Sequence, residues 1–202
     1  MKTLHLQHQK KTMYDYSKAE GEKIILEAVE RGLDAVILCP SAVVGPFDYR
    51  GSYLGQALLK MYKNKIPALI PGGYYWVDVR DVVSAAIKSV QSGRKGEKYI
   101  ISGNYCSLKD LSKIIGKMSG KNPPRLTVPV FLAFLVCPFF EFISTITKKK
   151  PMFTCQSLKI LISAPSNISL VKSQNELAYF PRPLEETLKD TFEWYKQNKY
   201  LN

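Results

Sequence analysis

Two residues near the start of the sequence have the types and the spacing that proton-transfer chemistry requires. Tyr14 and Lys18 lie four positions apart, and on a helix this spacing places both side chains on one face, one turn apart. A tyrosine has a pKa of about 10, so it exchanges protons near neutral pH only where a positive charge favours its phenolate form. The lysine supplies that charge, and its ammonium group can also hold a ribose hydroxyl of a cofactor.

The spacing alone is weak evidence, because chance yields one or two such pairs in a chain with 12 tyrosines and 23 lysines among 202 residues. Three pairs occur: Tyr14/Lys18, Tyr105/Lys109 and Tyr195/Lys199. Tyr105 precedes a helix that Ser107 is expected to cap, so its geometry is wrong. Tyr195 belongs to a C-terminal amphipathic helix, where packing explains it. Tyr14 opens a helix that leads directly into a buried strand, and context therefore favours the first pair.

Hydrophobic periodicity predicts the elements that position this pair. The pattern from 14 to 31 is helical, and four apolar residues are expected on its buried face: Ile24, Ile25, Ala28 and Val29. Gly32 suits a helix end, and the apolar run 35–39 suits a strand buried in a parallel sheet. Further helices are predicted at 52–65, 78–91, 108–119 and 184–199, and a second strand at 98–103. This alternation indicates an α/β fold.

Four short motifs follow one another from Tyr14 to the C-terminus. They begin at Tyr14 (Y-D-Y-S-K-A-E-G-E), Cys39 (C-P-S-A-V-V-G-P), Tyr75 (Y-W-V-D-V-R-D-V) and Pro181 (P-R-P-L-E-E-T-L). The first three resemble the active-site helix, the R-P-x-x-V-x-G-P loop and the F-V-x-V-x-D-V segment of the extended short-chain dehydrogenase/reductases, in the NAD-dependent epimerase/dehydratase family. The fourth resembles a C-terminal segment of the dihydroflavonol-reductase-like branch of that family.

The resemblance implies both the fold and its organisation. We expect the C-terminal portion of a Rossmann-type doubly wound parallel sheet, together with a small, mostly helical substrate domain. An unpatterned tail would occupy 1–13. A partial Rossmann-type domain with interleaved substrate-binding segments would occupy 14–125, and a mostly helical substrate-binding region 126–202.

The resemblance also implies roles for five residues. Tyr14 would give or take the proton at a carbonyl or hydroxyl carbon, and Lys18 would lower the pKa of Tyr14 and bind the nicotinamide ribose. Both would therefore touch the cofactor as well as act in catalysis. Pro40 and Val43 would border the nicotinamide, with a backbone group of Val43 near its carboxamide. Arg80 could face the substrate, and a surface arginine at the start of a helix is the alternative.

Parts of the family pattern are missing from the sequence. No G-x-x-G-x-x-G run occurs, although that glycine-rich turn holds the cofactor pyrophosphate at a helix N-terminus. The thirteen residues before Tyr14 are too few for the strand on which the family places its catalytic serine, and Cys39 replaces the usual arginine. We therefore expect a partial enzyme without most of its nucleotide domain, which binds NAD or NADP very weakly and is inactive alone.

Charge and composition exclude several other classes of protein. The net charge is +12, but the basic residues are scattered and the one tight run is 148–150, so a nucleic-acid partner is not expected. The four cysteines form no C-x-x-C pair and the two histidines are not spaced for a metal, which argues against zinc and a dense disulfide framework. The first ten residues lack the apolar core of a secretory signal, which favours a cytoplasmic location.

An apolar segment at 128–147 leaves a contact with a membrane open. Pro138 and Glu141 argue against a spanning helix, which needs about 20 mostly apolar residues. We expect a helix that packs on the protein or lies at a membrane interface, as in a protein peripheral to the membrane.

The leading interpretation is a partial NAD(P)-dependent oxidoreductase or epimerase. Hydride transfer would occur at a carbonyl or hydroxyl carbon, with Tyr14 moving the proton. The substrate would be a small molecule, either a ketone or alcohol or a nucleotide sugar. The alternative is a non-catalytic binding module or membrane-associated remnant that docks on a partner subunit. A homo-oligomer is left open as well.

Overall fold

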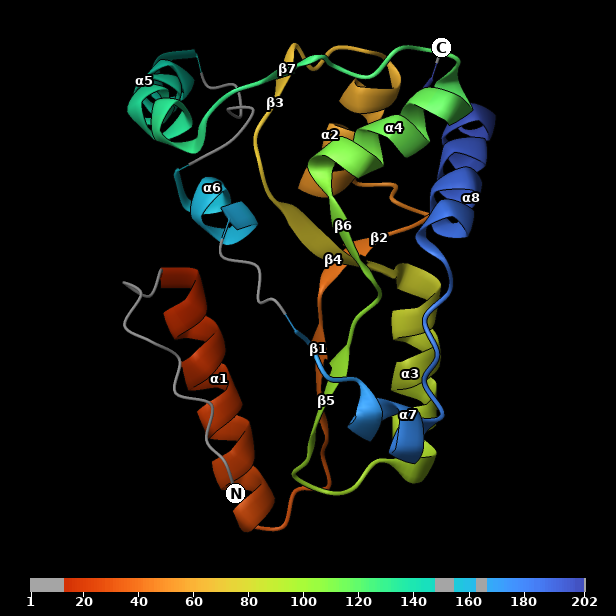
Figure 1. The fold of residues 1–202 in the computed structure, drawn as a ribbon. Coiled ribbons are helices and arrows are strands. Elements are labelled where there is room, and N and C mark those ends of the chain that lie inside the picture. Colours follow the sequence, from red (N-terminus) through yellow and green to blue (C-terminus); the bar gives the residue numbers. More distant parts are fainter. Residues whose placement is uncertain (1–12, 148–154, 163–166, 202) are drawn as a thin grey trace.

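The computed structural model describes residues 13–147, 155–162 and 167–201 (Figure 1). Helices and short, mostly parallel strands alternate along these residues, which confirms the predicted α/β fold class. The helices are α1 (Met13–Glu30), α2 (Tyr53–Tyr62), α3 (Val79–Ser92), α4 (Leu108–Ser119), α5 (Val130–Thr147), α6 (Cys155–Ile162), α7 (Val171–Leu177) and α8 (Leu184–Gln197). The strands are β1 (Ile37–Pro40), β2 (Ala42–Val44), β3 (Ala68–Leu69), β4 (Gly73–Asp78), β5 (Lys98–Ile101), β6 (Tyr105–Ser107) and β7 (Leu126–Thr127).

The strands pair in three small sheets. β1 pairs in parallel with β5, with Ile37 opposite Lys98 and Pro40 opposite Ile101, so the two predicted apolar strands are neighbours. β2 runs parallel to β4, and β6 adds to β4 in the antiparallel direction. β3 pairs in parallel with β7. Only Ser41 separates β1 from β2, so the chain passes directly from one parallel pair to the other.

A well-packed lobe forms where α2, α4 and α8 gather around β2 and β4 (Figure 1). Leu58, Leu111 and Leu188, one from each helix, are almost completely buried there. The predicted cap at Ser107 is confirmed, because its hydroxyl accepts a hydrogen bond of 3.0 Å from the Asp110 amide. We call this region the packed lobe.

A second cluster joins β5 to α3 and α7. Tyr99 and Ile101 from β5 are fully buried against Leu177 and Tyr179. The Tyr179 hydroxyl donates to the Ser102 carbonyl at 3.0 Å, so the polar atom of this buried ring is paired. The chain after α7 is thereby attached to the end of β5.

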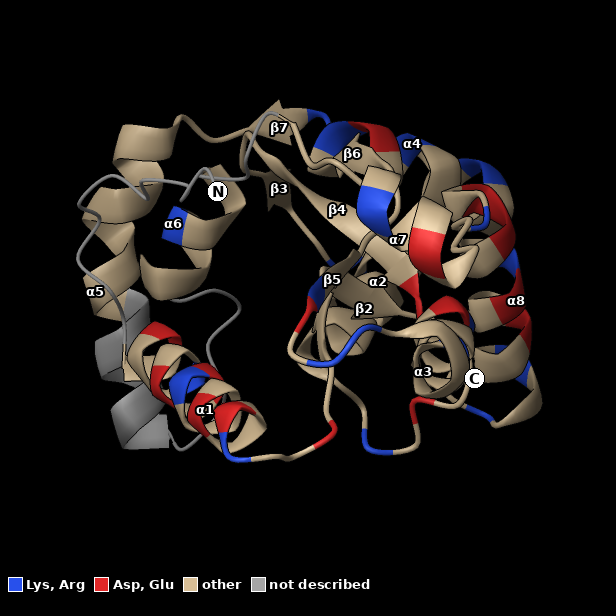
Figure 2. Ribbon diagram, turned by 90° about the horizontal axis from the view of Figure 1, so that it is seen from below, with Lys and Arg blue, Asp and Glu red and all other residues tan. Residues whose placement is uncertain are grey.

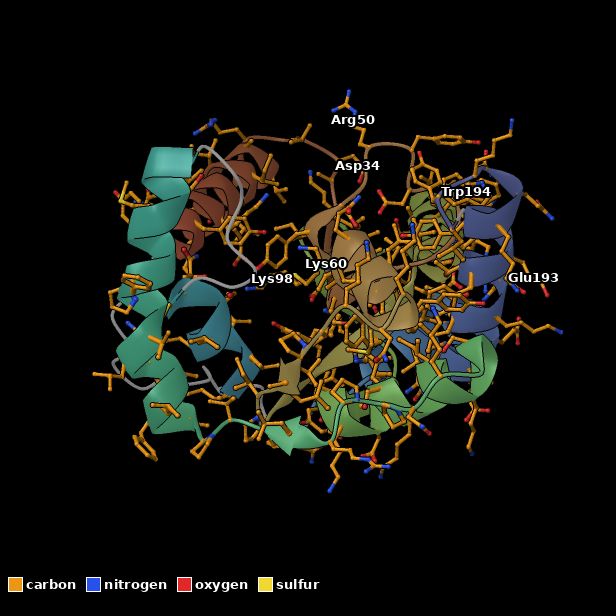
Figure 3. All side chains as sticks on the ribbon, turned by 90° about the horizontal axis from the view of Figure 1, so that it is seen from above. Asp34, Arg50, Lys60, Lys98, Glu193 and Trp194 are labelled. Atoms are coloured by element: carbon orange, nitrogen blue, oxygen red, sulfur yellow. A yellow bond between two sulfur atoms is a disulfide. The ribbon has the colours of Figure 1, made fainter. Side chains whose placement is uncertain are left out.

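The first helix is packed very differently. Figure 1 shows α1 on one side of the β1–β5 pair, with α3 and α7 on the other. The predicted helix is confirmed, but its predicted buried face is wrong, since α1 contains no buried residue and Ile24 is 59% exposed. An ion pair of 2.6 Å joins Glu22 of α1 to Lys98 of β5, whose side chain Figure 3 labels. Within the described chain, Ile24 and Ile25 are exposed, whereas Ala28 and Val29 are partly buried near the end of the helix.

The apolar segment after β7 forms α5, which packs on α6. Ala133 and Cys137 are buried against Leu158, and Cys137 forms a disulfide with Cys155 that the sequence did not suggest. Phe131, Leu135 and Phe139 are exposed, so the helix is only partly covered: it packs on the protein along one face. Within the described ranges, no helix is both long and apolar enough to cross a membrane.

The surface charges are mixed along the described elements. Figure 2 shows lysine and arginine interspersed with aspartate and glutamate on α1, α4, α7 and α8. Several of these residues form ion pairs, including Arg94 with Glu176 and Lys172 with Glu97. The basic residues behind the net charge of +12 are thus interspersed with acidic ones in this view.

Candidate functional site

The predicted tyrosine and lysine lie together in the first turns of α1. The Nζ atom of Lys18 is 5.5 Å from the centre of the Tyr14 ring, which confirms that the two side chains share one face of the helix. Tyr14 is 62% exposed, so its phenol is open to a partner outside the described chain. The pair therefore has the proximity that a lysine-assisted proton transfer needs, at a solvent-accessible position.

The direction of α1 places this pair at one end of the β1–β5 sheet. The helix precedes β1 and runs antiparallel to it, so its first turns lie level with the carboxyl end of the strand (Figure 1). Pro40 is the last residue of β1, and Val43 follows in β2. Pro40 thus ends a strand of the parallel β1–β5 pair, whereas Val43 lies in the neighbouring sheet and packs against the cluster around Tyr99. Ligands of open α/β sheets bind at the carboxyl ends of the strands, and the first turns of α1 lie toward that end of β1 (Figure 1).

The loop between β1 and β2 contains an unpaired polar atom. The side-chain oxygen of Ser41 is buried and has no hydrogen-bond partner among the described residues, although the Ser41 amide donates to the Ile101 carbonyl at 3.0 Å. Buried hydroxyl groups in folded proteins are normally paired. The loop from Pro40 to Val43 therefore fits a polar group that the described chain does not itself supply, and Ser41 is a site residue that sequence reasoning missed.

Cys39 occupies the position of the arginine in the loop motif. Burial raises the pKa of the Cys39 thiol, and the negative charge of Glu22 raises it further. The thiol is therefore neutral near pH 7, and this position provides no positive charge. Any contact that an arginine would make here must come from another residue.

Arg80 is held by the protein itself. Its guanidinium donates to Asp78 through Nε at 2.9 Å and Nη2 at 2.7 Å, and to Asp190 through Nη1 at 2.6 Å. Burial acts to raise the pKa of Asp78, but the hydrogen bonds from Arg80 outweigh it and keep that pKa below its ordinary value. These contacts give Arg80 a structural role that connects α3 to α8. A contact between Arg80 and substrate stays a prediction, because the hydrogen bonds of the guanidinium go to Asp78 and Asp190.

A second arginine anchors the C-terminal motif to the same helix. The backbone amide and Nε of Arg182 donate to Asp81 at 2.9 Å and 2.8 Å. Asp78 caps α3, because its side chain accepts a hydrogen bond of 2.7 Å from the Arg80 amide. The motifs at 75–82 and 181–188 are therefore one ion-paired unit in the structure, and sequence reasoning did not connect them.

A cavity of about 420 Å³ opens beside the packed lobe, and no sequence pattern indicated it. It lies between α2, β3, β4, α4 and α6, and its lining is mostly apolar. The helical spacing of Leu54 and Leu58 was visible in the sequence, but the residues of α6 that close the cavity are about 100 positions away. Figure 3 labels Lys60 on α2, the one charged residue in the described lining.

Comparisons with known proteins agree with the geometry. The profile of the NAD dependent epimerase/dehydratase family matches residues 2–102. The chain is 32% identical over 195 residues to the sterol demethylase protein B of Methylococcus capsulatus, which covers 92% of this chain and 57% of that protein. It is 25% identical over 192 residues to a Synechocystis protein with the provisional name dihydroflavonol 4-reductase, which covers 93% of this chain and 56% of that protein.

A solved structure shows the same fold. A nucleoside-diphosphate-sugar epimerase from Pseudomonas aeruginosa superposes with a TM-score of 0.75 at 20% identity, covering 96% of this chain and 58% of that one. The chain thus spans little more than half the length of the curated relatives and of the solved structure that it matches.

Proposed function

Because the chain belongs to the NAD dependent epimerase/dehydratase family, we propose that it is the proton-transfer and substrate-binding part of an NAD(P)-dependent oxidoreductase or epimerase. The reaction centre would be an alcohol or carbonyl carbon of a small molecule. The observation that carries the proposal is the contact between Tyr14 and Lys18 at the carboxyl edge of the β1–β5 sheet. Both relatives match the chain along more than nine-tenths of its length.

In this proposal Tyr14 moves the proton. Its hydroxyl donates to the substrate oxygen when a carbonyl is reduced, and its phenolate accepts the proton when an alcohol is oxidised. Lys18 would place a positive charge beside the phenol, because its Nζ atom is 5.5 Å from the centre of the Tyr14 ring. The exposure of Tyr14 leaves room for a substrate to approach the phenol.

The cofactor would supply the hydride at the neighbouring carbon. Lys18 would hold a hydroxyl of its ribose, and Pro40 and Val43 would border its nicotinamide. The buried Ser41 hydroxyl has no hydrogen-bond partner among the described residues, and this supports the proposal that a polar group of the cofactor lies beside it. We assign NAD or NADP without choosing between them, because no described residue is placed to read the adenosine ribose.

The chain alone is proposed to bind the cofactor weakly. The residues at the carboxyl edge fit the nicotinamide end, and the sequence contains no glycine-rich turn for the pyrophosphate. Two or three contacts of about 1–3 kcal/mol each barely exceed an association cost of at least about 4 kcal/mol. The expected dissociation constant is therefore millimolar or weaker, which corresponds to about −4.1 kcal/mol at 1 mM.

A second candidate is a non-catalytic module that docks on a partner subunit. The observation in its favour is the apolar row of Val83, Ile87 and Val90 on α3, which is exposed in the described chain. Such rows are uncommon on isolated soluble proteins. The two candidates differ in what Tyr14 does, because only the first requires its phenol.

The test uses a chimera. The residues of the Methylococcus relative that precede the matched region are fused ahead of Tyr14. Oxidation of NADH and NADPH is followed with the ketones progesterone and dihydroquercetin, and conversion of UDP-glucose in the presence of NAD or NADP is followed by separating the sugar nucleotides. Tyr14→Phe should lower turnover by about 10²–10⁴-fold and leave cofactor binding unchanged, because only proton transfer is removed. Lys18→Ala should impair both turnover and cofactor binding.

Tyr16→Phe is the matched control, since Tyr16 lies on the same helix and is exposed to a similar degree. It should leave turnover unchanged. Equal, small effects of Tyr14→Phe and Tyr16→Phe in an active chimera would reject the catalytic role and favour the docking module.

A further inference from the structure

The cavity beside the packed lobe is lined mostly by apolar side chains. Leucines, methionine and isoleucine from α2, β3, α4 and α6 supply most of the surface: Leu58, Met61, Leu69, Ile70, Leu111 and Leu158. Leu58, Leu69, Leu111 and Leu158 are buried to more than nine-tenths of their surface. The volume of about 420 Å³ lies within the range of sites that enclose a small organic molecule.

Two aromatic rings complete the cavity on the side of β4. Tyr74 and Trp76 meet edge to face, with their ring centres 5.4 Å apart. The only hydrogen-bond donor of the Trp76 side chain, Nε1, donates to the Cys106 carbonyl at 3.2 Å. Trp76 therefore offers a ligand the surface of its ring and no donor. Such a wall suits flat or ring-shaped apolar groups.

Polar groups are few among the lining residues. Tyr53 of α2 interacts with the Ser157 hydroxyl of α6; burial raises the pKa of Tyr53, and this interaction opposes the rise. Both residues line the cavity, and the Gln56 amide and the Tyr74 hydroxyl are further uncharged polar side-chain groups in a mostly apolar lining. Lys60 is the one charged side chain among the described lining residues.

This lining discriminates between the two substrate classes that the family allows. A nucleotide sugar carries a diphosphate with two negative charges, and burying those charges is costly unless cations and donors pair with them. One lysine does not supply that pairing. A ring-shaped alcohol or ketone has a single polar oxygen, which a hydroxyl pair such as Tyr53 and Ser157 can satisfy.

We infer that the cavity between α2, β4, α4 and α6 binds the apolar, ring-containing body of an alcohol or ketone and excludes nucleotide sugars. That this molecule is the substrate rests on the proposed function, whereas its binding to the cavity does not. Binding requires neither Tyr14 nor a cofactor. The two claims can therefore fail independently.

The experiment measures binding to the 202-residue chain without cofactor. Isothermal titration calorimetry is performed with progesterone, a fused-ring ketone, and with UDP-glucose. Progesterone should bind with a dissociation constant in the micromolar range, about 10³-fold tighter than a millimolar ligand. UDP-glucose should show no binding at the same concentrations. Absence of progesterone binding to folded chain, or tighter binding of UDP-glucose, would overturn the inference.

Filling the cavity locates the binding. Ala57→Phe adds a ring to the lining on α2, and it should weaken progesterone binding by tenfold or more. Ala86→Phe is the matched control, because Ala86 is a partly buried alanine of α3 that does not line the cavity. Ala68→Leu on β3 is a milder second filling variant that covers the case in which Ala57→Phe does not fold. Equal progesterone affinity in the filled and control variants would place the ligand elsewhere and contradict the inference.

Tyr14→Phe separates this inference from the proposed function. It should leave progesterone binding to the chain unchanged while it lowers turnover in the chimera. Binding without Tyr14-dependent turnover would remove the proposed function and keep the cavity assignment. Tyr14-dependent turnover of UDP-glucose, with no progesterone binding, would keep the proposed function and reject the cavity assignment.

Discussion

The packed lobe and the first helix are stabilised to very different degrees. Leu188 of α8 and Leu111 of α4 are buried completely or nearly so, whereas α1 contains no buried residue and rests on β5 through the Glu22–Lys98 ion pair. α3 also differs between its two sides, because Ala85 is buried and Ile87 is exposed. The difference shows that the residues of the packed lobe find their partners within this chain, while α1 and one side of α3 expose apolar side chains.

The exposed apolar side chains belong to the two helices that flank the β1–β5 pair. α1 lies on one side of this pair and α3 on the other (Figure 1). Parallel sheets are normally covered by helices on both faces. We therefore expect these surfaces to be covered when the nucleotide-binding part of the fold is present. Four predictions test this contrast.

The largest loss of stability is expected from Arg80→Ala in the ion-paired unit of α3 and α8. The substitution leaves the buried Asp78 carboxylate without its guanidinium partner, which should lower the free energy of unfolding by about 3–5 kcal/mol. Urea unfolding followed by circular dichroism measures the loss. Lys113→Ala removes an exposed pair with Asp110 and should lose less than about 1 kcal/mol. Similar losses in both variants would show that Asp78 is not a buried, paired group.

A matched pair of apolar truncations compares the two regions directly. Leu188→Ala in the packed lobe should lower the free energy of unfolding by about 2–5 kcal/mol, because it leaves a cavity in a buried core. Ile24→Ala on α1 should change it by less than about 0.5 kcal/mol, because that side chain is exposed. If Ile24→Ala lowered the free energy of unfolding as much as Leu188→Ala, α1 would be packed as well as the packed lobe, and the contrast between the two regions would be wrong.

Acid should destabilise the packed lobe through Asp78. Its pKa in the folded chain lies below the ordinary value of about 4, so the unfolded chain binds more protons and stability falls as the pH falls through that value. The contribution is fully present above about pH 5. Asp78→Asn removes the titrating group, and its free energy of unfolding should depend less on pH between about 2 and 5. Parallel pH profiles of the two proteins would contradict this origin of the acid sensitivity.

The smallest change in stability is expected from Ile87→Lys on α3. The side chain is exposed in the described chain, so the free energy of unfolding should change by less than about 0.5 kcal/mol. The unmodified chain is expected to self-associate through its exposed apolar surfaces, and the added charge should reduce this. Light scattering and urea unfolding measure the two effects. A loss of about 2 kcal/mol or more would mean that Ile87 is packed in solution.

Local signals in the sequence predicted more than half of the helices and the main parallel strand pair. Ser107 and the apolar runs around Ile37 and Ile100 were sufficient, because caps and periodicity act over a few residues. The buried face of α1 was predicted wrongly, since periodicity reveals an amphipathic helix without revealing whether anything covers it. The short strand β2 was missed because three residues carry no clear pattern.

The site was predictable only where its residues are close in sequence. Tyr14 and Lys18 are separated by one helical turn, and their contact follows from the spacing. The partner of Arg80 on α8 is 110 positions away, and the cavity needs α6 to close it, so neither is visible in local patterns. The unpaired Ser41 hydroxyl could be recognised only in the structure, because the burial of a single oxygen depends on the elements around it.

We propose that this chain supplies the proton-transfer residues and that another part of the enzyme binds most of the dinucleotide. Isothermal titration calorimetry of the purified, folded chain with NADH and with NADPH tests it most directly. We expect dissociation constants that are millimolar or weaker for both cofactors, and tighter binding in the chimera that contains the nucleotide-binding residues of the relative. Micromolar binding of either cofactor to the 202-residue chain would contradict the account, because its residues would then hold the whole dinucleotide themselves.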